Sequence, residues 1–200
     1  MKHAMMGKNE DGDIAMVSIA LLRGINVGGK NMIKMAELKT ALEAAGLSAV
    51  QTYIQSGNIL FRSQQDEAAL RLLIEDTIRA RFALTVPVVL RTATELDSLI
   101  SNLPFSKDEI AKAQAGTEAE VLYAALLNEA LSDERIAQVL AYKSADEQMV
   151  VAGRDVYLLF SDSIRNSKLA SHLIKLDESV TTRNWKTVLK LSELAKTLTP

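Results

Sequence analysis

The sequence predicts an α+β protein of two small subdomains, the first ferredoxin-like and the second of similar element order. Short apolar runs typical of strands alternate with longer segments whose apolar residues recur at helical spacing. In the first half the order is β-α-β-β-α-β, the split β-α-β arrangement of ferredoxin-like domains. The second half repeats this order of elements without repeating the residues.

The first half opens with an apolar strand and an amphipathic helix. The run AMVSIALLRG predicts a strand over residues 17–22, because it is apolar and ends at a glycine. In MAELKTALEAAG, Met35, Leu38 and Leu42 recur at helical spacing and form one face. Gly46 follows at the position where helices commonly end, since glycine adopts a left-handed backbone without steric cost.

A hairpin, a second helix and an edge strand complete the first subdomain. VQTYIQSGNILFRS predicts two short strands around a tight turn at Ser56-Gly57. Asp66 is a typical helix N-cap and precedes a segment with helical apolar spacing. VPVVLRT predicts a strand at a sheet edge, because Pro87 has no N–H to donate. Thr94 predicts the cap of a further helix.

The second half predicts the same succession of elements after a polar linker. EAEVLYAALL predicts a strand, Ser132 caps a helix, and EQMVVAGRDVYLLF predicts a hairpin that turns at Gly153-Arg154. SKLASHLIKL predicts another helix, and a short extended piece leads to a last helix capped by Thr182. The expected division is a disordered extension over 1–16, a ferredoxin-like subdomain over 17–104, a linker over 105–117 and a second α+β subdomain over 118–200.

The composition is that of an ordinary globular protein and excludes several chemistries. Of 200 residues, 48% are hydrophobic and 24% charged, and the formal net charge of −2 gives no global reason to expect a polyanion partner. Because there is no cysteine, disulfides and thiolate chemistry are excluded. His3 and His172, the two histidines, form no metal-binding pattern, and no cofactor is expected. No apolar run is long enough to span a bilayer, so we expect a cytoplasmic protein without a membrane partner.

Basic residues are concentrated in two short segments of this slightly acidic chain. Residues 21–40 and residues 181–200 each carry four basic side chains and one acidic side chain. Solvated helix faces explain many such runs. Two basic segments in an acidic chain also suit a confined anion site.

The first basic segment contains the loop RGINVGGKN, which is close to the phosphate-binding loop pattern. From Gly24 the chain matches G-x-x-x-x-G-K, but Asn31 stands where Ser or Thr would hold magnesium. Phosphate-loop proteins are built on parallel sheets, whereas these elements predict antiparallel sheets. A nucleotide-hydrolysing loop is therefore not expected.

The predicted topology places this loop beside a second glycine-containing turn. In the sheet order 4-1-3-2 of a ferredoxin-like domain, the first strand ends at the edge where the second strand turns into the third. The 23–31 loop and the 55–58 turn then lie side by side, where glycines free backbone N–H groups for close approach to a ligand. Turn geometry alone would also explain the same glycines and asparagines.

The second basic segment supplies further candidates. TTRNWKTVLKL predicts a helix whose first turn contains Arg183, Asn184 and Trp185, and the first turn of a helix favours anions. We expect this segment to face the 23–31 loop across the junction of the subdomains. The candidate ligand-binding residues are Arg23, Gly24, Asn26, Gly28, Gly29, Lys30, Asn31, Ser56, Gly57, Asn58, Arg183 and Asn184.

Several segments resemble one bacterial family over nearly the whole chain from about residue 17. ALLRGINVGGKNMIKMAELKTALEAAGLSAVQTYIQSGNILF, VPVVLRT, NLPF, SKL and TTRNWKTVLKLSELA are similar to the family catalogued as domain of unknown function 1697. The resemblance implies an α+β fold of two small subdomains, the first ferredoxin-like. The family pattern includes the candidate residues named above, and it implies no activity, cofactor or catalytic residue. Where such proteins often have glycine, this chain has Ile164-Arg165.

These observations favour a protein that binds an anionic, phosphate-bearing ligand at the 23–31 loop, either a small nucleotide or a nucleic acid. Ferredoxin-like sheets often bind nucleic acid, whereas an acidic chain with only 4% aromatic residues suits a small ligand better. One alternative is an enzyme in which Arg23, Lys30 or Arg183 stabilises developing charge. Another is a protein-interaction module, which an exposed apolar patch would indicate. The sequence assigns neither a reaction nor an oligomeric state.

Overall fold

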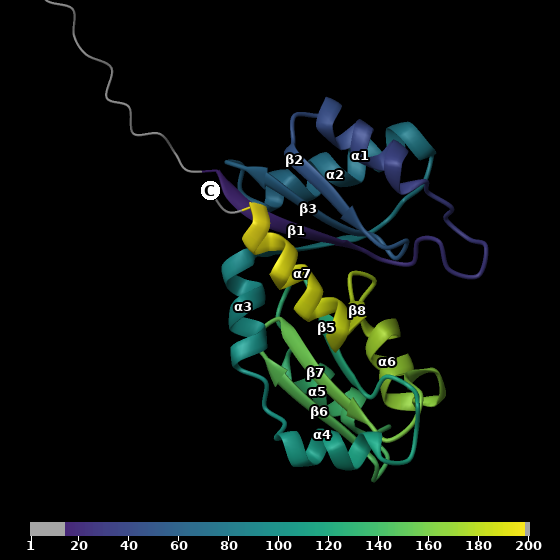
Figure 1. Cartoon of the computed structure of the whole chain (residues 1–200). Coiled ribbons are helices and arrows are strands. Elements are labelled where there is room, and N and C mark those ends of the chain that lie inside the picture. Colours follow the sequence, from purple (N-terminus) through teal and green to yellow (C-terminus); the bar gives the residue numbers. More distant parts are fainter. Residues whose placement is uncertain (1–14, 199–200) are drawn as a thin grey trace, which may run out of the picture.

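In the computed structural model, residues 15–198 are described, and they form two α+β subdomains (Figure 1). The first contains β1 (Met16–Leu22), α1 (Met35–Ala44), β2 (Ser48–Tyr53), β3 (Asn58–Ser63), α2 (Glu67–Phe82), β4 (Val88–Thr92) and α3 (Ala93–Ser101). Helix α4 (Lys107–Gln114) leads to the second. That subdomain contains β5 (Leu122–Leu126), α5 (Asp133–Leu140), β6 (Glu147–Ala152), β7 (Asp155–Phe160), the 3-10 helix η1 (Ile164–Asn166), α6 (Lys168–Leu176), β8 (Thr181–Asn184) and α7 (Trp185–Leu198).

Each subdomain is built on one four-stranded sheet, and the two sheets have corresponding strand orders. The first sheet has the order β2-β3-β1-β4 and the second the order β6-β7-β5-β8. All strand pairs are antiparallel. The predicted fold class, with a ferredoxin-like first subdomain and a second of similar order, is confirmed.

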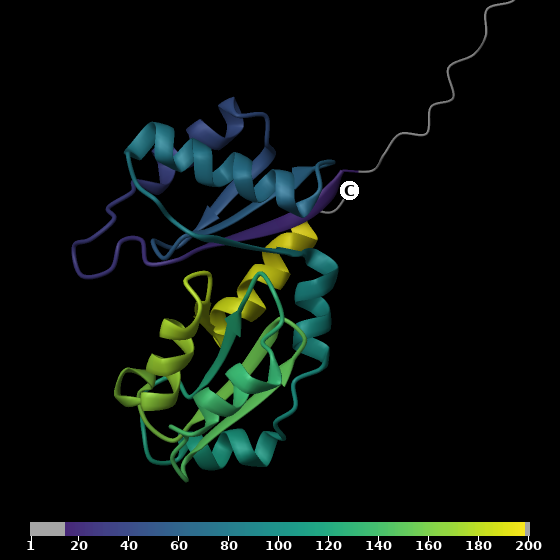
Figure 2. The same ribbon diagram turned by 180° about the vertical axis from the view of Figure 1, so that it is seen from behind.

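The helices form three layers around the two sheets (Figures 1 and 2). Helices α1 and α2 cover the outer face of the first sheet, where they bury Leu38, Leu42 and Ile74. Helices α5 and α6 cover one face of the second sheet. Helices α3 and α7 lie between the sheets, and one continuous apolar core joins residues of both sheets and both helices. This shared core makes the two subdomains one packed body.

Local signals in the sequence account for several element ends. The side chain of Asp66 caps α2 as predicted, because its carboxylate accepts the N–H of Ala69 at 2.8 Å. The prediction that Thr94 caps the next helix is wrong. Thr92 caps α3 instead, in a capping box with Glu95, since β4 continues to Thr92 and α3 begins immediately after it.

Two further expectations differ from the structure. Residues 105–117 were expected to be a linker, but α4 occupies most of this segment, begun by a capping box between Ser106 and Glu109. Arg183 and Asn184 belong to the short strand β8, which pairs with β5, and α7 begins only at Trp185. Apolar spacing in α7 extends to its first residues, so the sequence pattern concealed the four-residue strand before it.

The N-terminal extension expected over residues 1–16 lies largely outside the described residues. Of the expected extension over 1–16, only the last two positions are described, and Met16 already belongs to β1. Within residues 15–198, no helix has the length and apolar character needed to cross a membrane.

Two buried arginines join the subdomains reciprocally. Arg91, on the last strand of the first sheet, donates to the backbone oxygens of Leu127 and Arg154 in the second subdomain. Arg183, on the last strand of the second sheet, donates to the backbone oxygens of Leu22 and Ser56 in the first. Each arginine thus reaches into the subdomain to which it does not belong. There it binds at the point where a central strand of that subdomain, β5 or β1, ends beside a hairpin turn.

We call these two regions the first and the second corner. The first corner comprises the end of β1, the β1–α1 loop (residues 23–34) and the β2–β3 turn (54–57). The second corner comprises the end of β5, the β5–α5 loop (127–132) and the β6–β7 turn (153–154). Apart from Asn184, the candidate ligand-binding residues belong to the first corner or donate hydrogen bonds into it.

Candidate functional site

The β1–α1 loop of the first corner forms a small hairpin that projects from the body of the protein (Figure 1). The N–H of Lys30 donates to the oxygen of Val27 at 3.1 Å, which closes a tight turn. Gly28 and Gly29 occupy the two central positions with φ of 59° and 74°, as a type I′ turn requires. These glycines therefore have a definite conformational role at the tip.

Asn26 holds the base of this hairpin in place. Its side-chain oxygen accepts the N–H of Ile33 at 2.8 Å, and its Nδ2 donates to the oxygen of Ile33 at 3.0 Å. Nδ2 also donates to the oxygen of Gln55 at 2.8 Å, which ties the hairpin to the β2–β3 turn. The loop and the turn therefore lie side by side, as the topology predicted. Asn31 donates to the oxygen of Gly24 at 3.1 Å, so both asparagine amides make bonds within the corner.

Gly57 lets the β2–β3 turn approach the end of β1. Its oxygen accepts the N–H of Leu22 at 2.8 Å, and its φ is 79°. A Cβ at this position would lie 2.7 Å from Cβ of Leu22 and 2.9 Å from Cδ1 of Ile25. Only glycine fits here without a shift of the neighbours.

Arg23 connects the first corner to the C-terminal end of α6 through hydrogen bonds. Its guanidinium donates to the backbone oxygens of Ile174 at 3.0 Å and Asp177 at 3.1 Å, which are carbonyls at the helix C-terminus. Burial raises the pKa of the Asp177 carboxyl. Hydrogen bonds from Ser179 and the charges of Arg135 and Arg23 outweigh that effect, so the pKa lies below its ordinary value.

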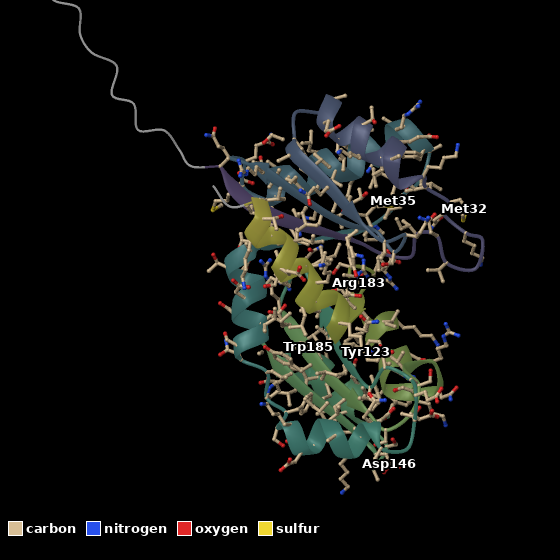
Figure 3. The ribbon with its side chains drawn as sticks, in the orientation of Figure 1. Met32, Met35, Tyr123, Asp146, Arg183 and Trp185 are labelled. Carbon is tan, nitrogen blue, oxygen red and sulfur yellow. The ribbon has the colours of Figure 1, made fainter. Side chains whose placement is uncertain are left out.

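Arg183 is the most deeply buried cation of the first corner, and it lies between the two subdomains (Figure 3). Its Nε donates to Oδ1 of Asn58 at 2.6 Å, and its Nη2 donates to the oxygens of Leu22 at 2.9 Å and Ser56 at 3.0 Å. Its Nη1 donates to acceptors within β8. All of these acceptors are neutral. Burial lowers the pKa of the guanidinium to about 10, so the group is still charged at neutral pH.

Arg91 has the equivalent position in the second corner, but its partner is a carboxylate. Its Nε and Nη2 donate to Oδ1 of Asp155 at 3.0 Å and 2.6 Å. Burial lowers the pKa of Arg91, and the charge of Asp155 partly offsets this effect. Asp155 is the first residue of β7, just as Asn58 is the first residue of β3. The first corner therefore has a neutral amide where the second has an anion.

The hydrogen bonds of Asn58 explain why this position is neutral. Its Nδ2 donates to the oxygen of Tyr53 at 3.0 Å and to Oγ of Ser56 at 3.0 Å, which helps to close the β2–β3 turn. An aspartate has no hydrogen to donate at neutral pH. An asparagine at position 58 can close the turn but cannot neutralise Arg183, whereas an aspartate could neutralise Arg183 but could not donate the hydrogen bonds that close the turn. The chain has the asparagine, so the first corner keeps a surplus positive charge.

The exposed residues of the hairpin lie around its tip. Gly28, Gly29 and Lys30 are exposed, and Lys30 has no ion pair among the described residues. Val27 and Met32 are 65% and 64% exposed, and Met32 lies out on the projecting loop (Figure 3). The remaining candidate, Asn184, accepts the N–H of Thr187 at 2.9 Å and so caps α7.

The candidates therefore separate into two groups. One group is engaged in the packing of the corner and the junction: Arg23, Gly24, Asn26, Asn31, Ser56, Gly57, Asn58, Arg183 and Asn184. Gly28, Gly29 and Lys30 face outward at the tip. Sequence reasoning missed Arg91 and Asp155. A signal was present, since both halves place an arginine directly before the capping residue of the last helix, as Arg91-Thr92 and Arg183-Asn184.

The fold and this corner define a protein of two halves with corresponding ferredoxin-like strand orders. Each half contributes one buried arginine that donates hydrogen bonds to the other half. The chain belongs to the family described as protein of unknown function (DUF1697), whose sequence model matches residues 16–157. It is also similar to the solved structure of a conserved bacterial protein from Streptococcus pneumoniae. That similarity has 28% identity and a TM-score of 0.71, and it covers 91% of this chain and 99% of the other. No curated protein matches the sequence.

Proposed function

We propose that the protein binds a phosphate-bearing anionic ligand, and specifically a nucleic acid, at the projecting hairpin of the first corner. The observation that carries this proposal is the asymmetry between two corners of the same topology. The β1–α1 loop spans residues 23–34, whereas the matching β5–α5 loop spans only residues 127–132. The fold itself therefore does not need a connection as long as the first.

Electrostatics at this corner favour an anion. The guanidinium of Arg183 has neutral partners in place of the carboxylate that Arg91 has in the second corner. A charge in a partly desolvated site acts over a longer range than one in water. At the tip, Gly28 and Gly29 are exposed next to Lys30, which makes no ion pair among the described residues. Backbone N–H groups of successive turn residues commonly bind phosphate oxygens.

The shape of the hairpin favours a polymer over a small nucleotide. The hairpin projects as a narrow loop (Figures 1 and 2), whose two sides are joined by backbone hydrogen bonds from Lys30 to Val27 and from Asn26 to Asn31. A major groove is wide enough to admit a narrow projection of this kind. The exposed side chains of Val27 and Met32 flank the charged tip and suit contact with sugars and base edges.

Binding of a fluorescent DNA duplex, followed by anisotropy between about 50 and about 200 mM salt, tests the proposal. We expect Lys30→Ala to weaken binding and to reduce the salt slope by about one. Lys143→Ala removes an exposed lysine of the second subdomain and serves as the matched control, which should behave as wild type. A wild-type protein that binds no duplex at the lowest salt, or a Lys30→Ala variant that binds as wild type, contradicts the proposal.

A protein partner is the second candidate, and one specific observation favours it. Val27, Met32 and Ile54 are all exposed at the first corner, with Ile54 at 49%. Exposed apolar side chains on one part of a surface can mark a protein contact. If no nucleic acid binds, substitution of Val27 and Met32 by serine is the matching test for a protein contact at the hairpin.

The enzyme alternative gains no support from the charged groups at this corner. Asp177 is the carboxylate that the structure brings to Arg23, and its pKa lies below the ordinary value once hydrogen bonds and nearby cations outweigh burial. A general acid or base working near neutral pH would need a pKa shifted the other way.

A further inference from the structure

A groove between α5 and α6 forms a second hollow, separate from the projecting hairpin. It has a volume of about 440 Å³, which lies within the usual range of small-molecule sites. Apolar parts of Val139, Ala141 and Leu176 line it together with polar groups from both helices. Neither the proposed function nor the arginine junction uses this groove.

Two stacked rings make one wall of the groove. The rings of Tyr142 and His172 have centroids 3.3 Å apart and planes inclined by only 10°. Nδ1 of His172 lies 2.8 Å from the backbone oxygen of Lys168 and must carry the hydrogen of that bond, because a carbonyl only accepts. Tyr142 is 45% exposed, so this aromatic wall is accessible from solvent.

A cation lies on the same groove. Lys175 follows His172 by one helical turn on α6 and lines the hollow, with Gln138 contributed by α5. Among the described residues Lys175 is exposed and makes no ion pair. The groove thus combines an apolar floor, an aromatic wall and a free ammonium group, which is the composition that binding pockets use to orient a small ligand.

We propose that this groove binds a small planar aromatic molecule that carries a carboxylate or phosphate group. The aromatic plane packs on the Tyr142–His172 pair in an offset stack. The anionic group pairs with the ammonium of Lys175 through a charge-assisted hydrogen bond. The proposal is independent of nucleic-acid binding at the hairpin.

Titration of the full-length protein with naphthoate, followed by NMR of the histidine ring protons, tests this proposal. The sequence has two histidines, so the ring signals are few, and His3 serves as an internal reference. We expect saturable upfield shifts of the His172 signals, because the ring current of a stacked ligand shields them. Naphthamide, which lacks the charge, and cyclohexanecarboxylate, which lacks the aromatic plane, should each bind about tenfold more weakly or worse.

Two variants distinguish specific binding in the groove from a general electrostatic attraction of naphthoate to lysine residues. Lys175→Met should weaken naphthoate binding by about tenfold, whereas Lys168→Met removes the same charge from the same helix outside the groove lining and should leave it unchanged. Circular dichroism verifies that both variants stay folded. No saturable shift of His172 with naphthoate, or an equal loss in both variants, overturns the proposal.

Discussion

The first and second corners have the same place in corresponding topologies and differ in charge and in length. In both, a buried arginine from the last strand of the other subdomain meets the end of a central strand and a hairpin turn. Arg91 meets the carboxylate of Asp155, whereas Arg183 meets the amide of Asn58. The second corner is closed by a short loop, and the first carries a projecting hairpin.

The shared features are those that the junction requires. An arginine that spans two subdomains supplies five donors in a rigid plane, which suits several converging carbonyl oxygens. The neutral amide of Asn58 closes the β2–β3 turn, so the surplus charge of Arg183 follows from the packing of the first corner. The extended hairpin has no such explanation, because the second corner has a short loop at the same place, and the hairpin is therefore where we place the function.

The largest expected effect comes from removal of a junction arginine. Arg183→Ala leaves the oxygens of Asn58, Leu22 and Ser56 without their donor in a buried place. We expect it to lower the free energy of unfolding by about 3 kcal/mol or more. Arg91→Ala should cost a similar amount, because it leaves the Asp155 carboxylate without its cation. Urea denaturation measures both.

Conservative variants sharpen this comparison. Arg183→Lys keeps the charge but loses the planar fork, so it should recover only part of the loss. If Arg183→Ala costs less than about 1 kcal/mol, the corner relaxes or admits water, and the account of the junction is wrong.

The next effect distinguishes the glycines of the two turns. At Gly57, a Cβ would lie 2.7 Å from Cβ of Leu22 and φ is 79°. At Gly153, φ is 60° and no atom lies within 4 Å of an added Cβ. We therefore expect Gly57→Ala to cost about 2–4 kcal/mol from strain and overpacking together, and Gly153→Ala about 1 kcal/mol from strain alone. Equal losses in thermal or urea unfolding would show that the approach to Leu22 is not tight.

Much of the fold could be predicted from the sequence, and much of the site could not. The order of strands and helices followed from local apolar periodicity, and the contact between loop and turn followed from topology. Whether Asn26 binds a ligand or a loop depends on the oxygens of Gln55 and Ile33, which only the folded chain brings to it. Local pattern also failed for Arg183, because a strand of four residues before a helix leaves no periodic signal of its own.

A smaller effect on stability depends on pH and involves the ion pair between Glu95 and Arg154 at the second corner. Burial raises the pKa of Glu95, but hydrogen bonds from Thr92 and the pairing with Arg154 outweigh it, so the pKa lies below its ordinary value. A carboxyl whose folded-state pKa is depressed stabilises the protein above its unfolded pKa of about 4.3, and this stabilisation is lost as the pH falls through the folded value.

We therefore expect Glu95→Gln to lower the free energy of unfolding by about 1 kcal/mol at neutral pH, a modest amount because the pair with Arg154 is partly exposed. The difference from wild type should shrink below about pH 4. Glu109→Gln alters the matching capping box of α4, which has no arginine, and should show the smaller pH dependence. A pH-independent difference for Glu95→Gln would contradict the ion-pair account.

The smallest effect on stability is expected at the hairpin tip. Lys30 is exposed and pairs with no carboxylate among the described residues, so Lys30→Ala should change the free energy of unfolding by less than about 0.5 kcal/mol. The same holds for Val27→Ser, because that side chain is 65% exposed. If the tip contributes to binding and not to packing, these variants must keep the stability of the wild type while their affinity for the ligand falls. If either substitution destabilises the protein as much as Glu95→Gln does, the hairpin is part of the structural framework, and the contrast between the two corners loses its functional meaning.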